Sequence, residues 1–135
     1  MKKEYRSHCP INFSQEIFGD KWSLLIIRDI MFKGKRYYGE FLNSEEKIST
    51  NILADRLEKL EDNKIIIKVS DVNNLSKFIY TLTDKGIDLL PLLLEMIVWG
   101  AKHDKQTKAP PEFINRFISD KESLILEIKK NLHFD

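Results

Sequence analysis

The amino-acid sequence predicts a mostly helical α+β fold, built as a single domain over residues 1–135. Three observations lead to this prediction. Several segments repeat apolar residues with the period of an α-helix. Two short segments rich in β-branched residues flank one polar turn, which predicts a β-hairpin. Hydrophobic residues make up 42% of the chain, enough for one hydrophobic core.

The first predicted helix covers Lys21–Phe32 and is expected to be buried. Its residues are apolar around most of the helical circumference, as in a helix that other elements enclose. Gly34 follows and suits the left-handed conformation that ends many helices. After it we expect a short strand at Arg36–Tyr38 and a short helix at Glu40–Glu46.

The next segment, Ser49–Asp62, has the pattern of a helix with one apolar face. Ser49 suits the N-cap position, because its hydroxyl can accept a hydrogen bond from a free backbone N–H. The apolar face consists of Ile52, Leu53, Leu57 and Leu60. The opposite face carries Asn51, Ala54, Asp55 and Glu58.

A β-hairpin is predicted from Ile65–Ser70 and Lys77–Leu82, with a polar turn at 71–76 whose asparagines tolerate the left-handed conformation. The order of helix, short helix, helix and hairpin is that of a winged helix-turn-helix domain. In this domain the short helix and the helix after it form the helix-turn-helix, the second being the recognition helix, and the hairpin is the wing.

Two further helices are expected after the wing. Thr83 is placed to cap a long helix that reaches about Lys102, and Pro91 should bend this helix locally. A proline-containing break at 109–111 precedes a last amphipathic helix over Glu112–Leu132.

Residues 89–99 of the long helix contain a single charged side chain. One small domain cannot easily bury a helix that is apolar on most sides, so a subunit interface explains it better than a cofactor pocket does. The predicted C-terminal dimerisation helices thus include an interface formed by Leu89, Leu90, Leu93, Met96, Ile97 and Trp99.

The composition excludes several classes of protein. No stretch of about 18 apolar residues predicts a membrane span, and no apolar core follows the basic N-terminus as in a secretory signal, so a cytoplasmic protein is expected. Cys9 is the single cysteine and the three histidines are scattered, so neither an internal disulfide nor a zinc site is expected, nor any other cofactor. The net charge of +1 does not by itself indicate a nucleic-acid partner.

The N-terminus of the predicted recognition helix is the candidate for reading DNA bases. It carries Ser49, Thr50 and Asn51, and an asparagine can bond an adenine edge through two hydrogen bonds. Asp55 lies one turn later and could accept from a cytosine amino group, although it would also repel phosphates. The alternative is that Ser49 and Thr50 only cap the helix and that Asn51 is solvated.

Lys35, Arg36 and Lys77 are candidate phosphate ligands, because the first two lie at the base of the motif and the third lies beside the wing tip. Each could instead be an ordinary solvated charge. Arg56 falls near the edge of the apolar face, so an ion pair within the fold is expected rather than a DNA contact. Residues 47–63 carry three basic and four acidic side chains, so the recognition segment is not electropositive.

Several motifs, in order along residues 9–100, resemble those of the HxlR-type bacterial winged-helix regulators. They are Cys9-Pro10, Gly19–Asp29 (GDKWSLLIIRD), Arg36–Phe41 (RYYGEF), Ile48–Leu60 (IS..IL..RL..L), Tyr80–Gly86 (Y.LT..G) and Trp99-Gly100. The resemblance implies a dimeric, sequence-specific transcription factor that binds double-stranded DNA. It also implies that residues 12–83 form the DNA-binding core and that residues 1–11 and 84–132 supply the dimerisation elements.

The same resemblance implies a sensor of oxidants or electrophiles at Cys9. On the residues alone, nearby His8 and Arg6 would favour the reactive thiolate, whereas a free cysteine is often an inert, packed side chain. A thiol-dependent enzyme is disfavoured, since neither a helix N-terminus nor a base can be assigned beside Cys9. A winged-helix module that docks proteins remains the other alternative, because the recognition helix is near neutral.

Overall fold

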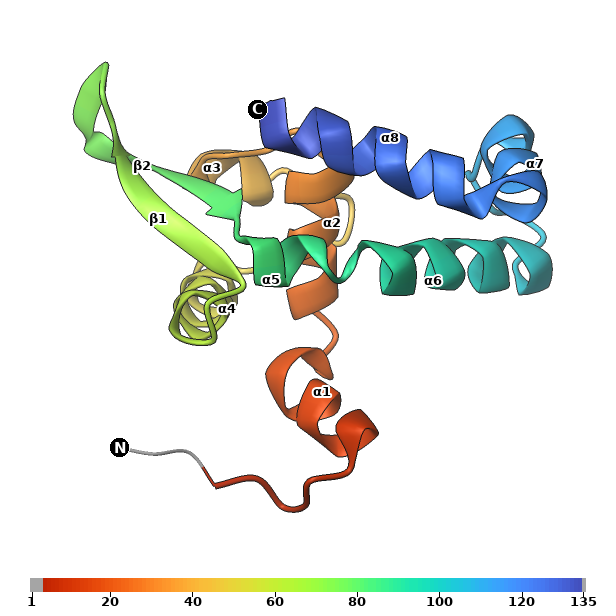
Figure 1. Cartoon of the computed structure of the whole chain (residues 1–135). Coiled ribbons are helices and arrows are strands. Elements are labelled where there is room, and N and C mark those ends of the chain that lie inside the picture. The colour runs from red at the N-terminus through yellow and green to blue at the C-terminus, as the bar shows by residue number, and fades with distance from the viewer. Residues whose placement is uncertain (1–3, 135) are drawn as a thin grey trace. The chain divides into compact units, whose positions relative to one another are not determined.

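The computed structural model describes residues 4–134 and contains two compact units, which meet in sequence between Gly86 and Ile87 (Figure 1). The prediction of a mostly helical fold with one hairpin is confirmed. None of the helices in the described part of the chain is long and apolar enough to span a membrane.

The first unit contains α1 (Pro10–Phe18), α2 (Ser23–Lys33), α3 (Tyr38–Phe41) and α4 (Thr50–Asp62). The predicted helices at Lys21–Phe32 and Ser49–Asp62 correspond to α2 and α4. Gly34 ends α2 in the left-handed conformation with a φ of 65°. Helix α1 was not predicted, because its short sequence buries Ile17 but leaves Ile11 and Phe13 exposed.

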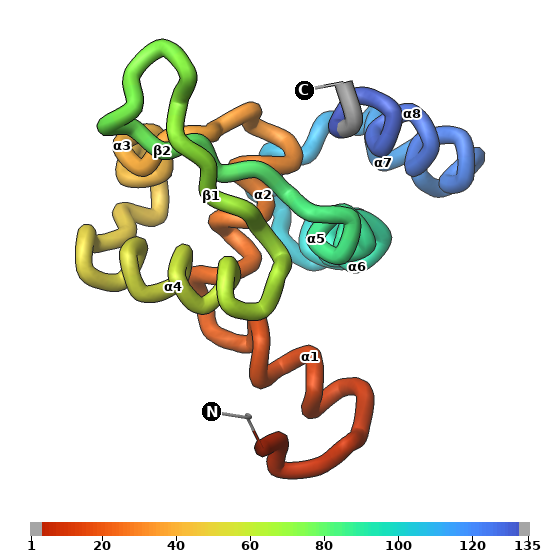
Figure 2. The backbone as a smooth tube through the Cα atoms, turned by 60° about the vertical axis from the view of Figure 1, so that its left-hand side comes forward, coloured from red at the N-terminus to blue at the C-terminus, as the bar shows by residue number. Residues whose placement is uncertain are grey.

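The wing consists of β1 (Ile66–Asp71) and β2 (Asn74–Leu82), which pair antiparallel with Ile66 opposite Leu82. Its turn is shorter than the predicted six residues, because β2 extends back to Asn74. Figure 2 shows the hairpin beside α3 and α4.

The strand predicted at Arg36–Tyr38 does not form, and α3 begins at Tyr38 instead. A single strand-like hydrogen bond remains there, from the Tyr80 N–H to the Arg36 carbonyl at 2.8 Å. The predicted short helix at Glu40–Glu46 is likewise displaced toward the N-terminus and ends at Phe41.

The core of the first unit lies between these elements, and its most buried side chains include Ile27, Phe41, Leu53, Leu60 and Ile66. The Phe41 and Tyr80 rings meet edge to face at 6.1 Å. The apolar face that the sequence predicts for α4 is the face it buries, since Leu53, Leu57 and Leu60 are all buried.

The prediction of one long helix bent at Pro91 is wrong. The chain forms α5 (Asp84–Ile87) and then α6 (Leu90–His103), with Pro91 in the first turn of α6. Proline suits a first turn because the N–H it lacks would have no partner there. Thr83, predicted to cap the long helix, caps the short α5 instead, since its hydroxyl accepts from the Gly86 N–H at 3.1 Å.

The single helix predicted over Glu112–Leu132 is two helices, α7 (Pro111–Ser119) and α8 (Lys121–Phe134). Asp120 separates them with a φ of −152°, which is not helical, and its carboxylate accepts from the Ser123 N–H in the first turn of α8. Within this unit Phe117 and Leu124 are buried.

Candidate nucleic-acid interface

The N-terminus of α4 presents Ser49, Thr50 and Asn51 on the surface. The Ser49 hydroxyl accepts from the Ile52 N–H at 3.3 Å, so the predicted N-cap is confirmed. The Tyr38 hydroxyl, on α3, donates to the Thr50 carbonyl at 2.8 Å. The first turn of α4 is therefore held both by its own cap and by the helix before it.

An ion pair fixes the middle of α4. Arg56 Nε donates to Asp20 Oδ2 at 2.8 Å, and the same guanidinium also pairs with Asp55. Burial opposes ionisation of Asp20, but hydrogen bonds from Ser23, Arg56 and the Trp22 N–H outweigh it and lower its pKa to about 2. The expected ion pair of Arg56 is confirmed, and its partner lies 36 residues away in sequence.

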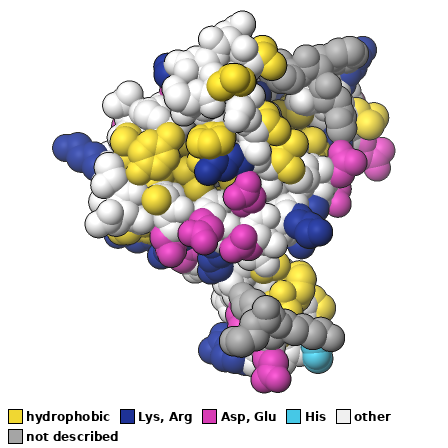
Figure 3. Space-filling view, turned by 90° about the vertical axis from the view of Figure 1, so that its left-hand side faces the viewer, with side chains coloured by type: hydrophobic (Ala, Val, Ile, Leu, Met, Phe, Trp, Pro, Cys, Tyr) yellow, Lys and Arg dark blue, Asp and Glu magenta, His cyan; other side chains and the backbone are white. Residues whose placement is uncertain are grey.

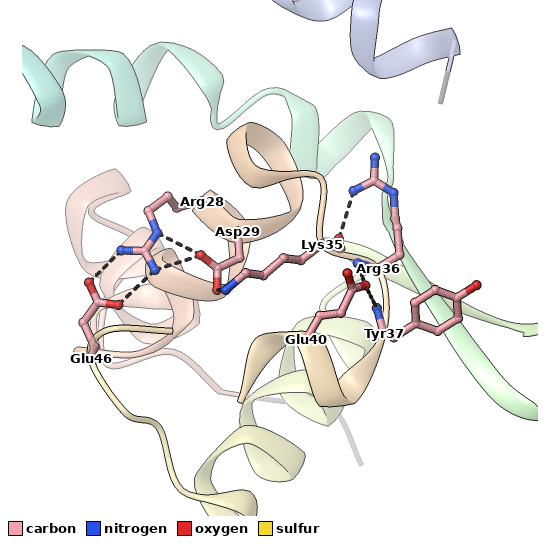
Figure 4. Close-up of polar contacts among 7 residues, drawn as sticks. All are labelled: Arg28, Asp29, Lys35, Arg36, Tyr37, Glu40 and Glu46. Carbon is pink, nitrogen blue, oxygen red and sulfur yellow. Dashed lines mark hydrogen bonds and ion pairs between the residues drawn. The ribbon is translucent and has the colours of Figure 1, made fainter. Parts of the chain in front are cut away.

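A second set of charges connects α2 to the segment before α4 (Figure 4). Arg28 forms two hydrogen bonds with the Glu46 carboxylate, at 2.7 and 3.0 Å, and also pairs with the buried Asp29 at 2.8 Å. The hydrogen bonds from Arg28 are the main reason why the pKa of Glu46 falls to about 2. On the other side of Asp29, the Lys35 ammonium lies 3.4 Å from its second oxygen.

Arg36 closes the end of α2. Its Nη1 donates to the Ile30 carbonyl at 3.0 Å. The same Nη1 donates to the Lys35 carbonyl at 2.9 Å, and Glu40 accepts from the Arg36 N–H (Figure 4). Two of the predicted phosphate ligands, Lys35 and Arg36, thus already have partners within the chain. Their contact with DNA stays a prediction, to be weighed against these bonds.

The wing is attached to the start of α3. The Tyr37 hydroxyl donates to Asp71 Oδ2 at 2.9 Å, and Asp71 is buried at the end of β1. The hydrogen bond to Asp71 raises the pKa of Tyr37. Lys77 is exposed on β2, with its ammonium 5.6 Å from the centroid of the Tyr37 ring. No sequence pattern connected Tyr37 with Asp71, which are 34 residues apart.

Asn51 and Asp55 lie on the exposed side of α4, as the helical pattern predicts. The exposed Asn51 side chain makes no hydrogen bond within residues 4–134, whereas the Asp55 carboxylate is paired with Arg56. That pairing offsets the negative charge that would otherwise oppose approach to phosphates.

Cys9 is exposed and occupies the N-cap position of α1. The backbone N–H groups of Asn12 and Ile11 lower the pKa of its thiol. This position corrects one step of the sequence reasoning, which found no helix N-terminus beside Cys9. That N-terminus could not be seen because α1 itself was not predicted. In the described chain no group of three or more His, Cys, Asp or Glu side chains is arranged to hold a metal.

The residues predicted for the subunit interface differ in exposure. Leu90 and Leu93 are buried, and Leu89 and Ile97 are intermediate. Met96 and Trp99 are 47% and 69% exposed. The Trp99 ring packs on His103 at 4.9 Å. Only the exposed members of this set have substantial surface left to bury against a second chain.

Helices α3 and α4 followed by a β-hairpin define a winged helix-turn-helix, a class of DNA-binding proteins. Residues 17–108 match the family of HxlR-like helix-turn-helix proteins. Over 93 residues, the chain is 34% identical to the HTH-type transcriptional regulator YodB of Bacillus subtilis. The aligned region covers 68% of this chain and 82% of YodB.

Solved structures agree with this match. The structure of PA1607 has a TM-score of 0.67 and 36% identity, covering 78% of this chain and 70% of PA1607. The oxidised form of the redox regulator HypR has a TM-score of 0.64 and 29% identity, covering 71% and 98% of the two chains. Quinone-bound YodB of B. subtilis has a TM-score of 0.55 and 33% identity, covering 70% and 98%. The chain belongs to the HxlR-like helix-turn-helix family, and it is a DNA-binding regulator of transcription.

Proposed function

We propose that this regulator acts as a homodimer on an inverted-repeat operator, with the N-terminus of α4 in the major groove of each half-site. The observation that carries the proposal is the exposed first turn of α4, which contains Thr50 and Asn51. The Ser49 cap and the hydrogen bond from Tyr38 hold this turn in place. Recognition helices contact base edges with their N-terminal residues, and asparagine pairs with adenine in this way.

The phosphate contacts are assigned mainly to the wing. Lys77 is exposed beside the wing tip, and the Tyr37–Asp71 hydrogen bond holds that tip against α3. A rigid wing positions a cation at a constant distance from α4, which a backbone contact requires. Lys35 and Arg36 are assigned a smaller share, because both also bind groups within the chain.

The subunit contact is assigned to the two regions outside the DNA-binding core of residues 12–83. Residues 84–132 leave Leu92, Met96 and Trp99 of α6 exposed. At the other end, Ile11, the last of residues 1–11, is exposed, as is the neighbouring Phe13 of α1, which lies just inside the core range. Large apolar side chains of this number suit burial against a second copy of the chain, as in a two-fold dimer.

Regulation by oxidants or electrophiles is assigned to Cys9. The thiol is exposed, and backbone N–H groups of α1 lower its pKa, which favours the nucleophilic thiolate. Two similar structures are the redox regulator HypR and quinone-bound YodB. Modification of Cys9 would alter the start of α1, within the region assigned to the dimer.

The central experiment selects bound fragments from genomic DNA and then measures binding of variants to the selected site. Asn51→Ala should weaken binding by about 1–3 kcal/mol and relax preference at one base position. Asn115→Ala, an exposed asparagine of α7, is the matched control and should bind as the unaltered protein does. If Asn51→Ala bound every site as tightly as the unaltered protein does, the recognition assignment would be refuted.

Oligomeric state is tested separately by light scattering. The unaltered chain should be a dimer at micromolar concentration, and Met96→Glu should shift it toward monomer through an unpaired charge at the interface. Met96 is chosen over Leu93, because a charge at the buried Leu93 would disrupt folding as well. A monomeric unaltered chain would exclude the dimer.

A further inference from the structure

A cavity of about 360 Å³ lies between α4 and the hairpin, within the first unit. Its apolar part comes from Leu57 of α4 and from the rings of Tyr38 and Tyr80. This volume falls within the range of sites that bind small molecules. Of the lining residues, the DNA-binding assignment above uses only Tyr38, whose hydroxyl holds the first turn of α4.

Three carboxylates line the same cavity, those of Glu58, Glu61 and Asp62. None of them has an ion pair or a side-chain hydrogen bond with any residue between 4 and 134. Lys68 is the basic residue of the lining, and its ammonium lies 4.1 Å from the centroid of the Phe78 ring. The lining is therefore net negative, with carboxylates that the fold does not compensate.

The position of these carboxylates on α4 is unfavourable for the helix itself. All three fall in its last five residues, where the helix dipole is negative. Glu58 also lies three and four residues before Glu61 and Asp62, and like charges at these spacings repel. An arrangement that costs stability and is left unpaired indicates a role outside the folding of α4.

Tyr80 is a second and independent feature of the cavity. The residue is only 7% exposed, yet its hydroxyl has no hydrogen-bond partner in the described chain. Burial, then the nearby Glu61 carboxylate and Tyr38, raise the pKa of this hydroxyl, so it stays protonated and its oxygen can accept a hydrogen bond from a ligand N–H. Within residues 4–134 no fully buried side-chain oxygen lacks a hydrogen-bond partner, so the unpartnered Tyr80 hydroxyl is open to the cavity that the residue lines, where a ligand can reach it.

We propose that this cavity binds a small organic ammonium ion with an apolar or aromatic body. The carboxylates of Glu58, Glu61 and Asp62 attract the ammonium group, and the Tyr38 and Tyr80 rings with Leu57 contact the body. The faces of aromatic rings strengthen the binding of organic cations. A bare metal ion would gain nothing from contact with the apolar part of the lining. An anionic ligand would meet three carboxylates and one lysine.

The site also has a consequence for DNA binding, which rests on the proposed function. Figure 3 shows the face that carries α4 and the hairpin, where acidic side chains gather beside hydrophobic ones. Carboxylates on a recognition helix repel the phosphates that the helix must approach. A bound cation neutralises part of this charge, so it should raise the affinity for DNA several-fold and act as a ligand that promotes DNA binding.

Titration calorimetry of the full chain without DNA tests the site, using 2-phenylethylammonium as the probe. It should bind one equivalent per chain and at least about tenfold tighter than two controls. These are 2-phenylethanol, which has the same shape without the charge, and ethylammonium, which has the charge without the ring. Equal binding of either control, or no saturable binding of the probe up to about 10 mM, would overturn the proposal.

Variants localise the binding. Glu61→Gln should weaken it about tenfold, and Tyr80→Phe should weaken it several-fold with an unchanged melting temperature, because the lost hydroxyl has no partner in the fold. Glu122→Gln, an exposed carboxylate of α8, is the control and should bind normally. Unaltered binding by Glu61→Gln would place the probe elsewhere and refute the site.

Fluorescence anisotropy on a selected DNA fragment, with and without the probe, tests the regulatory consequence. The affinity of the unaltered chain should rise several-fold, and that of Glu61→Gln should respond weakly. A calorimetric signal without any change in DNA affinity would refute the regulatory role. Absence of DNA binding altogether would refute the proposed function, while the calorimetry would still decide whether the cavity binds the cation.

Discussion

Charged side chains are paired in one part of the first unit and unpaired in another, although α4 takes part in both. The first place, called the paired corner below, consists of the ion pairs Arg56–Asp20 and Arg28–Glu46. The pKa of each of the two carboxylates is about 2. At the other place, the cavity between α4 and the wing, the carboxylates of Glu58, Glu61 and Asp62 have no partner among residues 4–134. The paired corner fixes where α4 lies, whereas the unpaired groups remain available to a ligand.

The arginines follow the same division. Arg6, Arg28, Arg36 and Arg56 all donate to groups within the first unit, and Arg116 donates to Ser123 within the second. Lysines such as Lys77 are left on the surface beside the elements assigned to DNA. A planar guanidinium suits fixed hydrogen bonds, and a flexible ammonium suits contact with phosphates. The difference explains why a near-neutral chain can still bind a polyanion.

The largest expected effect comes from breaking the paired corner. Arg56→Ala should lower the free energy of unfolding by about 2 kcal/mol, because it leaves the Asp20 carboxylate half-buried without its cation. Urea denaturation measures the change. Lys59→Ala, in the next turn of the same helix, is the control and should stay close to the unaltered protein. Equal losses in the two variants would show that the ion pair does not stabilise α4.

Acid should weaken the same corner. The pKa of Asp20 is about 2 in the folded chain and about 3.9 in the unfolded chain, so its contribution is present above about pH 4 and is lost as the pH falls toward 2. The loss should reach about 2 kcal/mol, and Glu46 should add to it in the same direction. Chemical denaturation between pH 6 and 2 measures it. Asp20→Asn should flatten this dependence, and an unchanged slope would contradict the assignment.

How much of this arrangement the sequence could predict depends on how local each interaction is. Helix α4 was predicted with its cap, because Ser49 and the apolar spacing act within the helix. Arg56 was correctly assigned to an ion pair from its place at the edge of the apolar face, but Asp20 could not be named, being 36 residues away. The Tyr37–Asp71 hydrogen bond escaped notice for the same reason.

The errors have physical causes as well. Pro91 is compatible with a bend inside a helix or with the first turn of a new one, and the sequence around it does not decide between them. The cavity between α4 and the wing requires the register of the hairpin against α4, which periodicity does not contain. Glu58 was correctly placed opposite the apolar face of α4, where it is exposed, but only the folded chain brings it together with Tyr80.

A smaller effect of opposite sign is expected at the unpaired end of α4. Glu58→Gln should raise the free energy of unfolding by about 0.3–0.5 kcal/mol, because it removes repulsion from Glu61 and Asp62 and an unfavourable charge near the helix C-terminus. Urea denaturation at low salt measures the gain, which should shrink in high salt. A loss of stability would mean that Glu58 has a stabilising partner.

The last comparison separates a structural arginine from a lysine that contacts DNA. Lys77→Ala should leave folding almost unchanged, since Lys77 is exposed. In DNA binding it should reduce the slope of log K against log salt by about 0.9 per lost phosphate contact, on every sequence tested. Arg36→Ala should instead lower stability by about 1 kcal/mol, because the carbonyls of Ile30 and Lys35 lose their donor. Anisotropy titrations over a range of salt, together with urea denaturation of the same samples, resolve the two effects. A reduced salt slope with normal stability in Arg36→Ala would show that Arg36 contacts phosphate, as the sequence suggested. Arg36 would then not belong with the arginines that stabilise the fold.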